Sequence, residues 1–120
     1  HDFKLRFFKK PFPEFSGDRQ WLEKISFLAQ KHVHFGIIAS GDEDIVDAGR
    51  AAEIRLETGA LAVAWEGAGG ARASQFNAVP FLEIRAISDL ANLDATKDFK
   101  TKLQLAMSQV ADLLFLISKL

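Results

Sequence analysis

The sequence predicts an α/β protein, in which short strands alternate with helices. Runs of β-branched and small apolar residues recur between segments whose apolar residues have helical spacing, and several of these runs end in Ser, Gly or acidic residues. With 120 residues, 48% hydrophobic and 26% charged, the chain is long enough to bury a core. We expect a single domain over residues 1–120, with 1–17 forming an arm or edge strand and 18–120 the α/β core.

The composition excludes several function classes. The 15 Lys and Arg are balanced by 16 Asp and Glu, so a net charge of -1 gives no electrostatic case for nucleic acid or an anionic membrane as a partner. The chain has no Cys, which excludes disulfide and thiol chemistry. No apolar run approaches the roughly 18 to 20 residues of a membrane span, and no signal-peptide pattern opens the chain, so we expect a cytoplasmic protein.

The first segment, 1–17, is rich in Phe and cations. Phe3, Leu5 and Phe7 alternate with basic residues, which predicts a half-buried strand. The alternative is an aromatic, basic surface that stacks on single-stranded nucleic acid, but the balanced charge of the chain favours an edge strand or arm.

The next segment predicts a helix followed by a strand. Asp18 is a candidate N-cap for a helix that extends to about Lys31, and the β-branched run 33–39 predicts a strand. The helical apolar residues are Trp21, Leu22, Ile25, Leu28 and Ala29. His32 and His34 would share one strand face, but two imidazoles without a third ligand are weak support for a metal, and we expect no metal site.

A second helix and strand follow. Asp47 is a candidate N-cap for a helix over 48–57, which Gly59 ends. The apolar run 60–65 predicts a strand, and a helix is expected over 70–76.

The last part of the chain predicts a strand over 81–87 and a long terminal helix. We expect one face of this helix to belong to the core. That face consists of Phe99, Leu103, Ala106, Val110, Leu113, Leu114 and Ile117.

The polar residues that follow the strands are the candidate site residues, because ligands of α/β sheets bind beyond the carboxyl ends of the strands. Three segments qualify, namely 40–42, 65–67 and 85–89. The Gly-rich turn after the second of them also resembles a dinucleotide-binding loop. However, Arg72 stands at the third Gly position, and Glu66 would repel a pyrophosphate at the helix N-terminus.

The runs "FGIIASGDEDI" and "LAVAWEGAGGARASQFNAVPFLEIRAISDLAN", followed by the terminal helix, resemble the second half of the nucleoside phosphorylase/hydrolase superfamily. The likeness covers residues 33 to 120 and is strongest to methylthioadenosine/S-adenosylhomocysteine nucleosidases. It implies a three-layer mixed sheet flanked by helices, and cleavage of the bond between ribose and a purine without a cofactor. It also implies a missing N-terminal half and a homo-oligomer, such as a dimer.

The resemblance further implies roles for individual residues. Asp89 matches the acid that protonates the leaving purine, and Glu66 matches the carboxylate that accepts hydrogen bonds from the ribose hydroxyls. Arg85 and Ser88 lie beside the acid, where Arg85 would orient it or hold a neighbouring carboxylate, and Ser88 would hydrogen-bond the acid or the base.

Three further residues fall at substrate-binding positions of the family. Trp65 stands where these nucleosidases usually carry Met against the sugar, while Asp44 falls about where an aromatic stacks on adenine, next to Ile45. Ala64 replaces a further acidic residue of the family turn. These departures leave open a second function, a non-catalytic module that binds a nucleoside or another partner.

Overall fold

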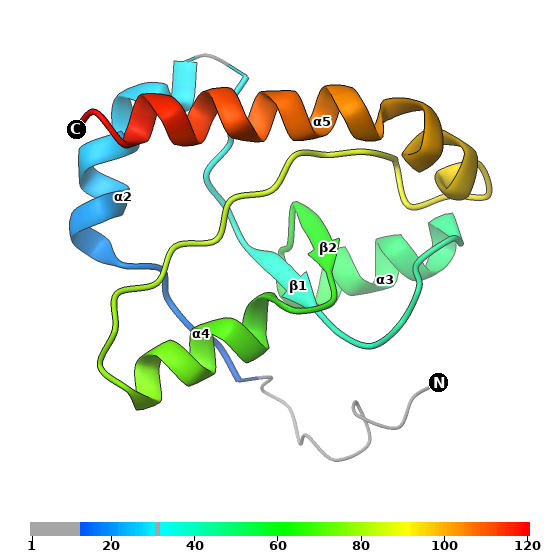
Figure 1. The fold of residues 1–120 in the computed structure, drawn as a ribbon. Coiled ribbons are helices and arrows are strands. Elements are labelled where there is room, and N and C mark those ends of the chain that lie inside the picture. The colour runs from blue at the N-terminus through cyan, green and yellow to red at the C-terminus, as the bar shows by residue number, and fades with distance from the viewer. Residues whose placement is uncertain (1–12, 31) are drawn as a thin grey trace. The chain divides into compact units, whose positions relative to one another are not determined.

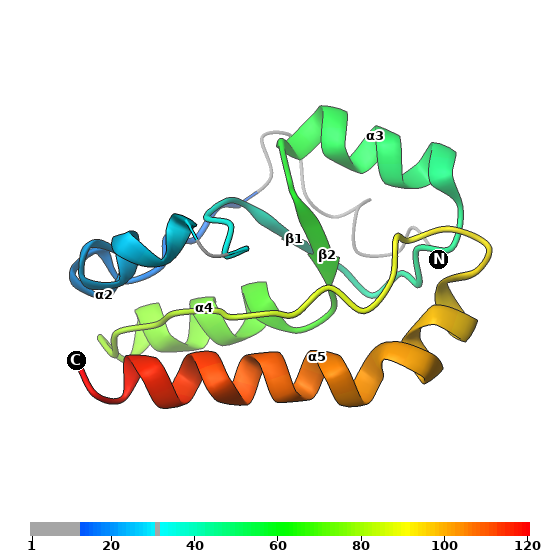
Figure 2. The same ribbon diagram turned by 90° about the horizontal axis from the view of Figure 1, so that it is seen from above.

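The computed structural model describes residues 13–30 and 32–120 (Figures 1 and 2). The predicted strand around Phe3 and Phe7 lies outside these residues. The chain divides into two compact units. We call residues 13–44 and 58–83 the sheet unit, and residues 45–57 and 84–120 the helical unit.

The sheet unit contains a small parallel sheet. Strand β1 (Ile38–Ser40) pairs with strand β2 (Ala62–Ala64), with Ser40 opposite Ala64. Both strands are shorter than the predicted runs 33–39 and 60–65. Their pairing continues for one further hydrogen bond at each end, from the Leu61 amide to the Ile37 carbonyl (2.9 Å) and from the Gly41 amide to the Ala64 carbonyl (3.1 Å). The described chain is therefore α/β, but the predicted three-layer sheet is not seen in it.

Helix α2 (Arg19–Ile25) begins where the sequence predicts, because the Asp18 side chain accepts a hydrogen bond from the Trp21 amide at 2.9 Å. The prediction that it extends to Lys31 is wrong for residues 26–30, which form the 3-10 helix η1 (Ser26–Gln30). The Ser26 amide and hydroxyl both donate to the Glu23 carbonyl, three residues back. This i to i−3 pattern tightens the turn and ends the α-helix.

Helix α4 (Gly67–Phe76) directly follows β2 and begins earlier than the expected residue 70. Its first turn is tied to β1, because the Ser40 hydroxyl oxygen accepts a hydrogen bond from the Ala68 amide at 3.0 Å. The buried residues of α4 are Gly67 and Ala71.

The predicted strand over 81–87 is not formed. This segment has no regular secondary structure and pairs with no strand among the described residues. Its start is held by a hydrogen bond from the Asp18 amide to the Phe81 carbonyl. Apolar alternation gives a segment its strand propensity, but a ladder also needs a neighbouring strand to supply the second set of backbone groups.

The helical unit contains α3 (Ala48–Thr58), apart from its last residue, and α5 (Ala95–Ile117). Asp47 caps α3 as predicted, since its carboxylate accepts from the Arg50 amide at 2.8 Å. Gly59, with φ of +70°, follows the helix end, where a residue with a side chain would be strained.

The predicted apolar face of α5 is only partly core. Ala106 and Ile117 are buried, but the exposed fractions of Phe99 and Leu114 are 46% and 49%. Single exposed apolar residues are ordinary, whereas several on one helix indicate a surface that another element can cover. None of the helices within the described residues is both long and apolar enough to cross a membrane.

Candidate functional site

The carboxyl ends of β1 and β2 lie at the same edge of the parallel sheet. The register that places Ser40 opposite Ala64 brings the segment after β1, 41–44, beside the segment after β2, 65–67. Two of the three predicted strand-end segments, both in the sheet unit, therefore meet as the sequence indicated. The third, 85–89, belongs to the helical unit.

Trp65 joins the two segments of this edge. Its indole N–H donates to the Glu43 backbone carbonyl at 3.2 Å, although 59% of the residue is exposed. The hydrogen bond holds the segment 41–44 to the end of β2, and the exposure leaves much of the indole accessible. The side chain can thus fix a loop and present an aromatic surface at the same time.

Glu66 is the N-cap residue of α4, yet its side chain does not cap the helix. Its backbone has φ of −106° and ψ of −20°, and its carbonyl accepts from the Gly70 amide at 3.1 Å. An N-cap side chain normally acts from an extended backbone and accepts from one of the next amides. The exposed Glu66 side chain therefore makes no capping hydrogen bond to the helix that it precedes.

The glycines of the turn have a packing role. A Cβ on Gly67 would overlap the Glu83 carboxylate, and a Cβ on Gly70 would lie 3.1 Å from the Phe81 ring. Gly69, in contrast, faces no atom within 4 Å. Gly67 and Gly70 thus allow the segment 81–83 to pack closely against the start of α4, as expected if the glycines serve close packing rather than phosphate binding.

In the helical unit, Ser88 and Asp89 form a local hydrogen-bonded turn. The Ser88 hydroxyl donates to Asp89 Oδ2 at 2.7 Å, and the Ala91 amide donates to Asp89 Oδ1 at 2.9 Å. Both residues are half-buried, whereas Arg85 is exposed. The two oxygens of Asp89 thus each accept one hydrogen bond, which fixes the orientation of the carboxyl group.

The remaining predicted site residues differ in burial. Ile45, at the start of the helical unit, is 8% exposed, whereas Asp44, at the end of one segment of the sheet unit, is exposed. His32 and His34 are exposed, and no group of three or more metal-ligating side chains occurs in the part of the chain that the structure describes.

Sequence reasoning missed Glu83 and the Glu43 carbonyl. A signal for Glu83 was available, because it is the acidic residue inside the otherwise apolar start of the run 81–87. A charged residue in such a run needs a partner or a polar environment. The role of a backbone carbonyl such as that of Glu43 has no signal in the side-chain sequence.

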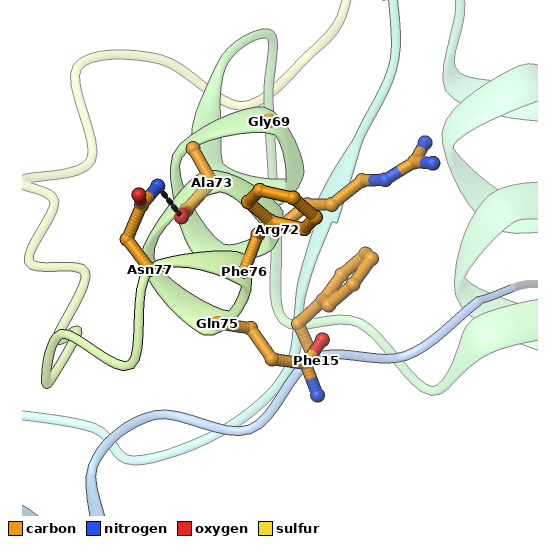
Figure 3. A pocket seen from close by; sticks show the side chains of 7 residues that line it. All are labelled: Phe15, Gly69, Arg72, Ala73, Gln75, Phe76 and Asn77. Atoms are coloured by element: carbon orange, nitrogen blue, oxygen red, sulfur yellow. Dashed lines mark hydrogen bonds between the residues drawn. The ribbon is translucent and has the colours of Figure 1, made fainter.

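A hollow of about 610 Å³ lies between α4 and the segment that holds Phe15 (Figure 3). It is open to solvent, and Phe76, one of its lining residues, is 91% exposed. None of the predicted site residues lines it. The lining residues are Phe15, Gly69, Arg72, Ala73, Gln75, Phe76 and Asn77.

The family was determined by comparison with known proteins. Residues 8–118 match the model of the phosphorylase superfamily, and the chain belongs to this superfamily. This match confirms the resemblance to the nucleoside phosphorylase/hydrolase superfamily that the sequence motifs indicated.

Relatives with this fold include nucleosidases. The chain is 31% identical over 85 residues to a 5'-methylthioadenosine/S-adenosylhomocysteine nucleosidase of Thermotoga maritima, and 42% identical over 72 residues to one of Treponema pallidum. A solved structure from Francisella philomiragia, assigned to the same activity, superposes with a TM-score of 0.84 at 26% identity and covers 99% of this chain.

The chain spans only part of these relatives. The aligned regions cover 71% of this chain but 39% of the Thermotoga protein, and 56% of this chain but 27% of the Treponema protein. The chain also corresponds to 56% of the Francisella chain. The matched region is therefore a portion of the fold that these relatives have.

Proposed function

We propose that this chain carries the sugar-binding and base-protonating part of a purine nucleosidase of the methylthioadenosine/S-adenosylhomocysteine type. The observation that carries the proposal is the placement of Glu66. In a member of the phosphorylase superfamily, this carboxylate stands at the carboxyl end of a parallel strand and is not used to cap α4. Ligands of α/β folds bind at such strand ends.

In the proposed reaction, the bond between ribose C1′ and the purine nitrogen breaks, and its electron pair leaves with the base. Asp89 supplies the proton to the five-membered ring of the purine, and a nucleophile, water or phosphate, then bonds to C1′. Glu66 accepts hydrogen bonds from the 2′- and 3′-hydroxyls, and its negative charge stabilises the cationic sugar of the transition state.

The other residues have supporting roles in the proposal. Ser88 fixes the Asp89 carboxyl by the 2.7 Å hydrogen bond, and Arg85 orients the acid or a neighbouring carboxylate. Trp65 forms a flat contact for the sugar and its 5′-substituent. Asp44 and Ile45 belong to the base-binding side.

We also propose that the complete fold is a three-layer mixed sheet in a homodimer, and that the portion of the relatives that this chain does not match supplies further strands and the site of the nucleophile. The exposed apolar residues of α5, among them Phe99 and Leu114, provide surface for such additional elements. A cytoplasmic location is part of the same proposal.

The experiment is an assay of base release by the full-length protein as encoded. Methylthioadenosine, S-adenosylhomocysteine, adenosine and inosine are supplied with and without phosphate, and free base is separated and quantified. We expect release of adenine from the first two substrates. A requirement for phosphate would indicate a phosphorylase, and no release from any of the four would contradict the enzyme proposal.

The second candidate is a non-catalytic nucleoside-binding module. The observation that favours it is the use of both Asp89 oxygens by Ser88 and the Ala91 amide, which is also the arrangement of a carboxylate that only fixes a loop. Binding of the nucleoside with no base release, unchanged in Asp89→Asn, would support this candidate over the enzyme.

A further inference from the structure

The hollow beside α4 has two walls, and both belong to the sheet unit. One wall is the C-terminal part of α4 with the residue that follows it, and the other is Phe15. Phe81 joins the two walls. Its carbonyl accepts from the Asp18 amide at 2.6 Å, and a Cβ on Gly70 of α4 would lie 3.1 Å from its ring. The segment before α2 is therefore held beside α4 by backbone and side-chain contacts.

Two phenyl rings supply the apolar surface of the hollow. In Figure 3 the rings of Phe15 and Phe76 and the side chain of Arg72 lie together at one side of α4. Phe15 is half-buried, whereas Phe76, the last residue of α4, is 91% exposed. A phenyl ring gains hydrophobic free energy when another surface covers it, and aromatic residues and Arg are enriched in protein interfaces. The hollow is thus apolar surface that association can bury.

One cation and one anion adjoin these rings. Arg72 lines the hollow, and Glu14 immediately precedes Phe15 in the chain. Both are exposed, and neither forms an ion pair within residues 13–30 and 32–120. A small anion that pairs with Arg72 would also meet the nearby carboxylate of Glu14, whereas a surface that carries both charges can satisfy both. The charges therefore favour a partner that has one charge of each sign.

We infer that this surface, formed by Glu14, Phe15, Arg72 and Phe76 and called the α4 surface below, binds a second copy of the chain about a twofold axis. In a twofold interface, both protomers use the same patch, so a contact from one residue to another occurs twice. Arg72 of each protomer pairs with the partner subunit's Glu14, and the phenyl rings pack between the two ion pairs. The inference rests on the homodimer of the proposed function and goes beyond it, because it names the residues of the interface.

The test measures the self-association constant of the full-length protein as encoded by sedimentation velocity over a wide range of concentration. The variants are Arg72→Glu, Glu14→Arg, the double variant with both changes, and Phe76→Ala. Two matched controls lie outside the α4 surface. Lys97→Glu makes the same change of charge as Arg72→Glu, and Leu56→Ala truncates an apolar side chain that is 88% exposed.

We expect each single charge reversal to weaken the association about ten- to a hundredfold, because it replaces two attractive pairs in the dimer by two repulsive ones. The double variant should recover most of this loss. An equimolar mixture of Arg72→Glu and Glu14→Arg should associate more tightly than either variant alone, since both of its ion pairs are attractive again. The two controls should not change the association.

Phe76→Ala tests the apolar part of the interface. It should weaken the association about tenfold or more, as the loss of a central aromatic contact implies. Because the ring is 91% exposed in the protomer, the melting temperature of the dissociated protein should not fall. A loss of melting temperature equal to the loss of association would contradict the role of this ring as a contact.

The remaining outcomes separate this inference from the proposed function. A dimer unaffected by the charge reversals and by Phe76→Ala would use another surface and would overturn the inference alone, as would a loss that neither the double variant nor the mixture recovers. A protein that is monomeric at every concentration would contradict the homodimer as well. Base release, measured on the same samples, tests the nucleosidase proposal independently, because none of the predicted site residues lines the hollow.

Discussion

The edge of the parallel sheet and the loop 84–94 of the helical unit each present a carboxylate from the predicted site. In the loop, the Asp89 carboxyl is held by its own neighbours, with one oxygen on the Ser88 hydroxyl and the other on the Ala91 amide. At the sheet edge, the Glu66 side chain makes no capping hydrogen bond to the helix that it precedes, and the Glu83 carboxylate, distant in sequence, packs against the first residue of that helix. The comparison shows that a local turn orients one acid, whereas the other stands between the end of β2 and the start of α4.

The substitution with the largest expected effect, Asp89→Asn, tests the role of the loop 84–94 in this comparison. Asp89→Asn keeps the size of the side chain but removes the acidic proton, so base release by the full-length protein should fall by about 10²- to 10⁴-fold, the usual contribution of a general acid. The measurement is kcat for methylthioadenosine. The control is Asp112→Asn, on the exposed surface of α5, which should leave kcat unchanged. An Asp89→Asn enzyme with normal kcat would restrict this residue to fixing the loop.

Glu66→Gln tests the sheet edge and should cause the next largest effect. The amide removes a charge-assisted acceptor for the ribose hydroxyls, so kcat/KM should fall by about ten- to a hundredfold, the equivalent of about 1.5 to 3 kcal/mol. Because Glu66 does not cap α4, the melting temperature should change little. A large loss of stability with normal kinetics would show that Glu66 has only a structural role. Glu14→Gln, at an exposed position, is the control.

Ser40→Ala tests whether tertiary contacts hold the sheet edge. The substitution removes the acceptor of the Ala68 amide, and we expect the free energy of unfolding to fall by about 1 to 3 kcal/mol. Chemical denaturation gives this value, and the exposed Ser108 provides the control variant Ser108→Ala. An unchanged free energy would mean that the hydrogen bond from β1 to α4 contributes nothing to stability.

Trp65→Phe should have the smallest effect. Phe keeps an aromatic ring but cannot donate to the Glu43 carbonyl, so the segment 41–44 should lose about 0.5 to 1.5 kcal/mol of protection in amide hydrogen exchange. Exchange in α5 serves as the internal reference. Unchanged protection of 41–44 would show that the indole N–H does not hold this loop.

The sequence predicted the features that depend on near neighbours. The caps at Asp18 and Asp47 are confirmed, as is the helix end at Gly59, because each involves a side chain or a backbone angle within a few residues of the helix end. The family resemblance is confirmed over most of the chain. The site roles of Glu66 and Asp89 stay predictions.

The predictions that were wrong share a different cause. The run 81–87 has strand propensity but no partner strand among the described residues, and α2 ends early because Ser26 bonds to the Glu23 carbonyl. The α5 face that was expected to be core keeps exposed residues such as Phe99. Strand pairing and burial depend on what lies opposite a segment, which apolar periodicity does not specify.

The amino-acid sequence by itself determined the helix caps, the α/β class and the membership of the phosphorylase superfamily, since these follow from local chemistry and from the order of the motifs. Only the tertiary structure decided that the Glu83 carboxylate lies against the first residue of α4, and that Trp65 bonds to the segment after β1. Helix N-termini and hydrogen-bond donors act over a few ångströms in space. Which groups come within that range depends on chain packing between residues that are far apart in the sequence.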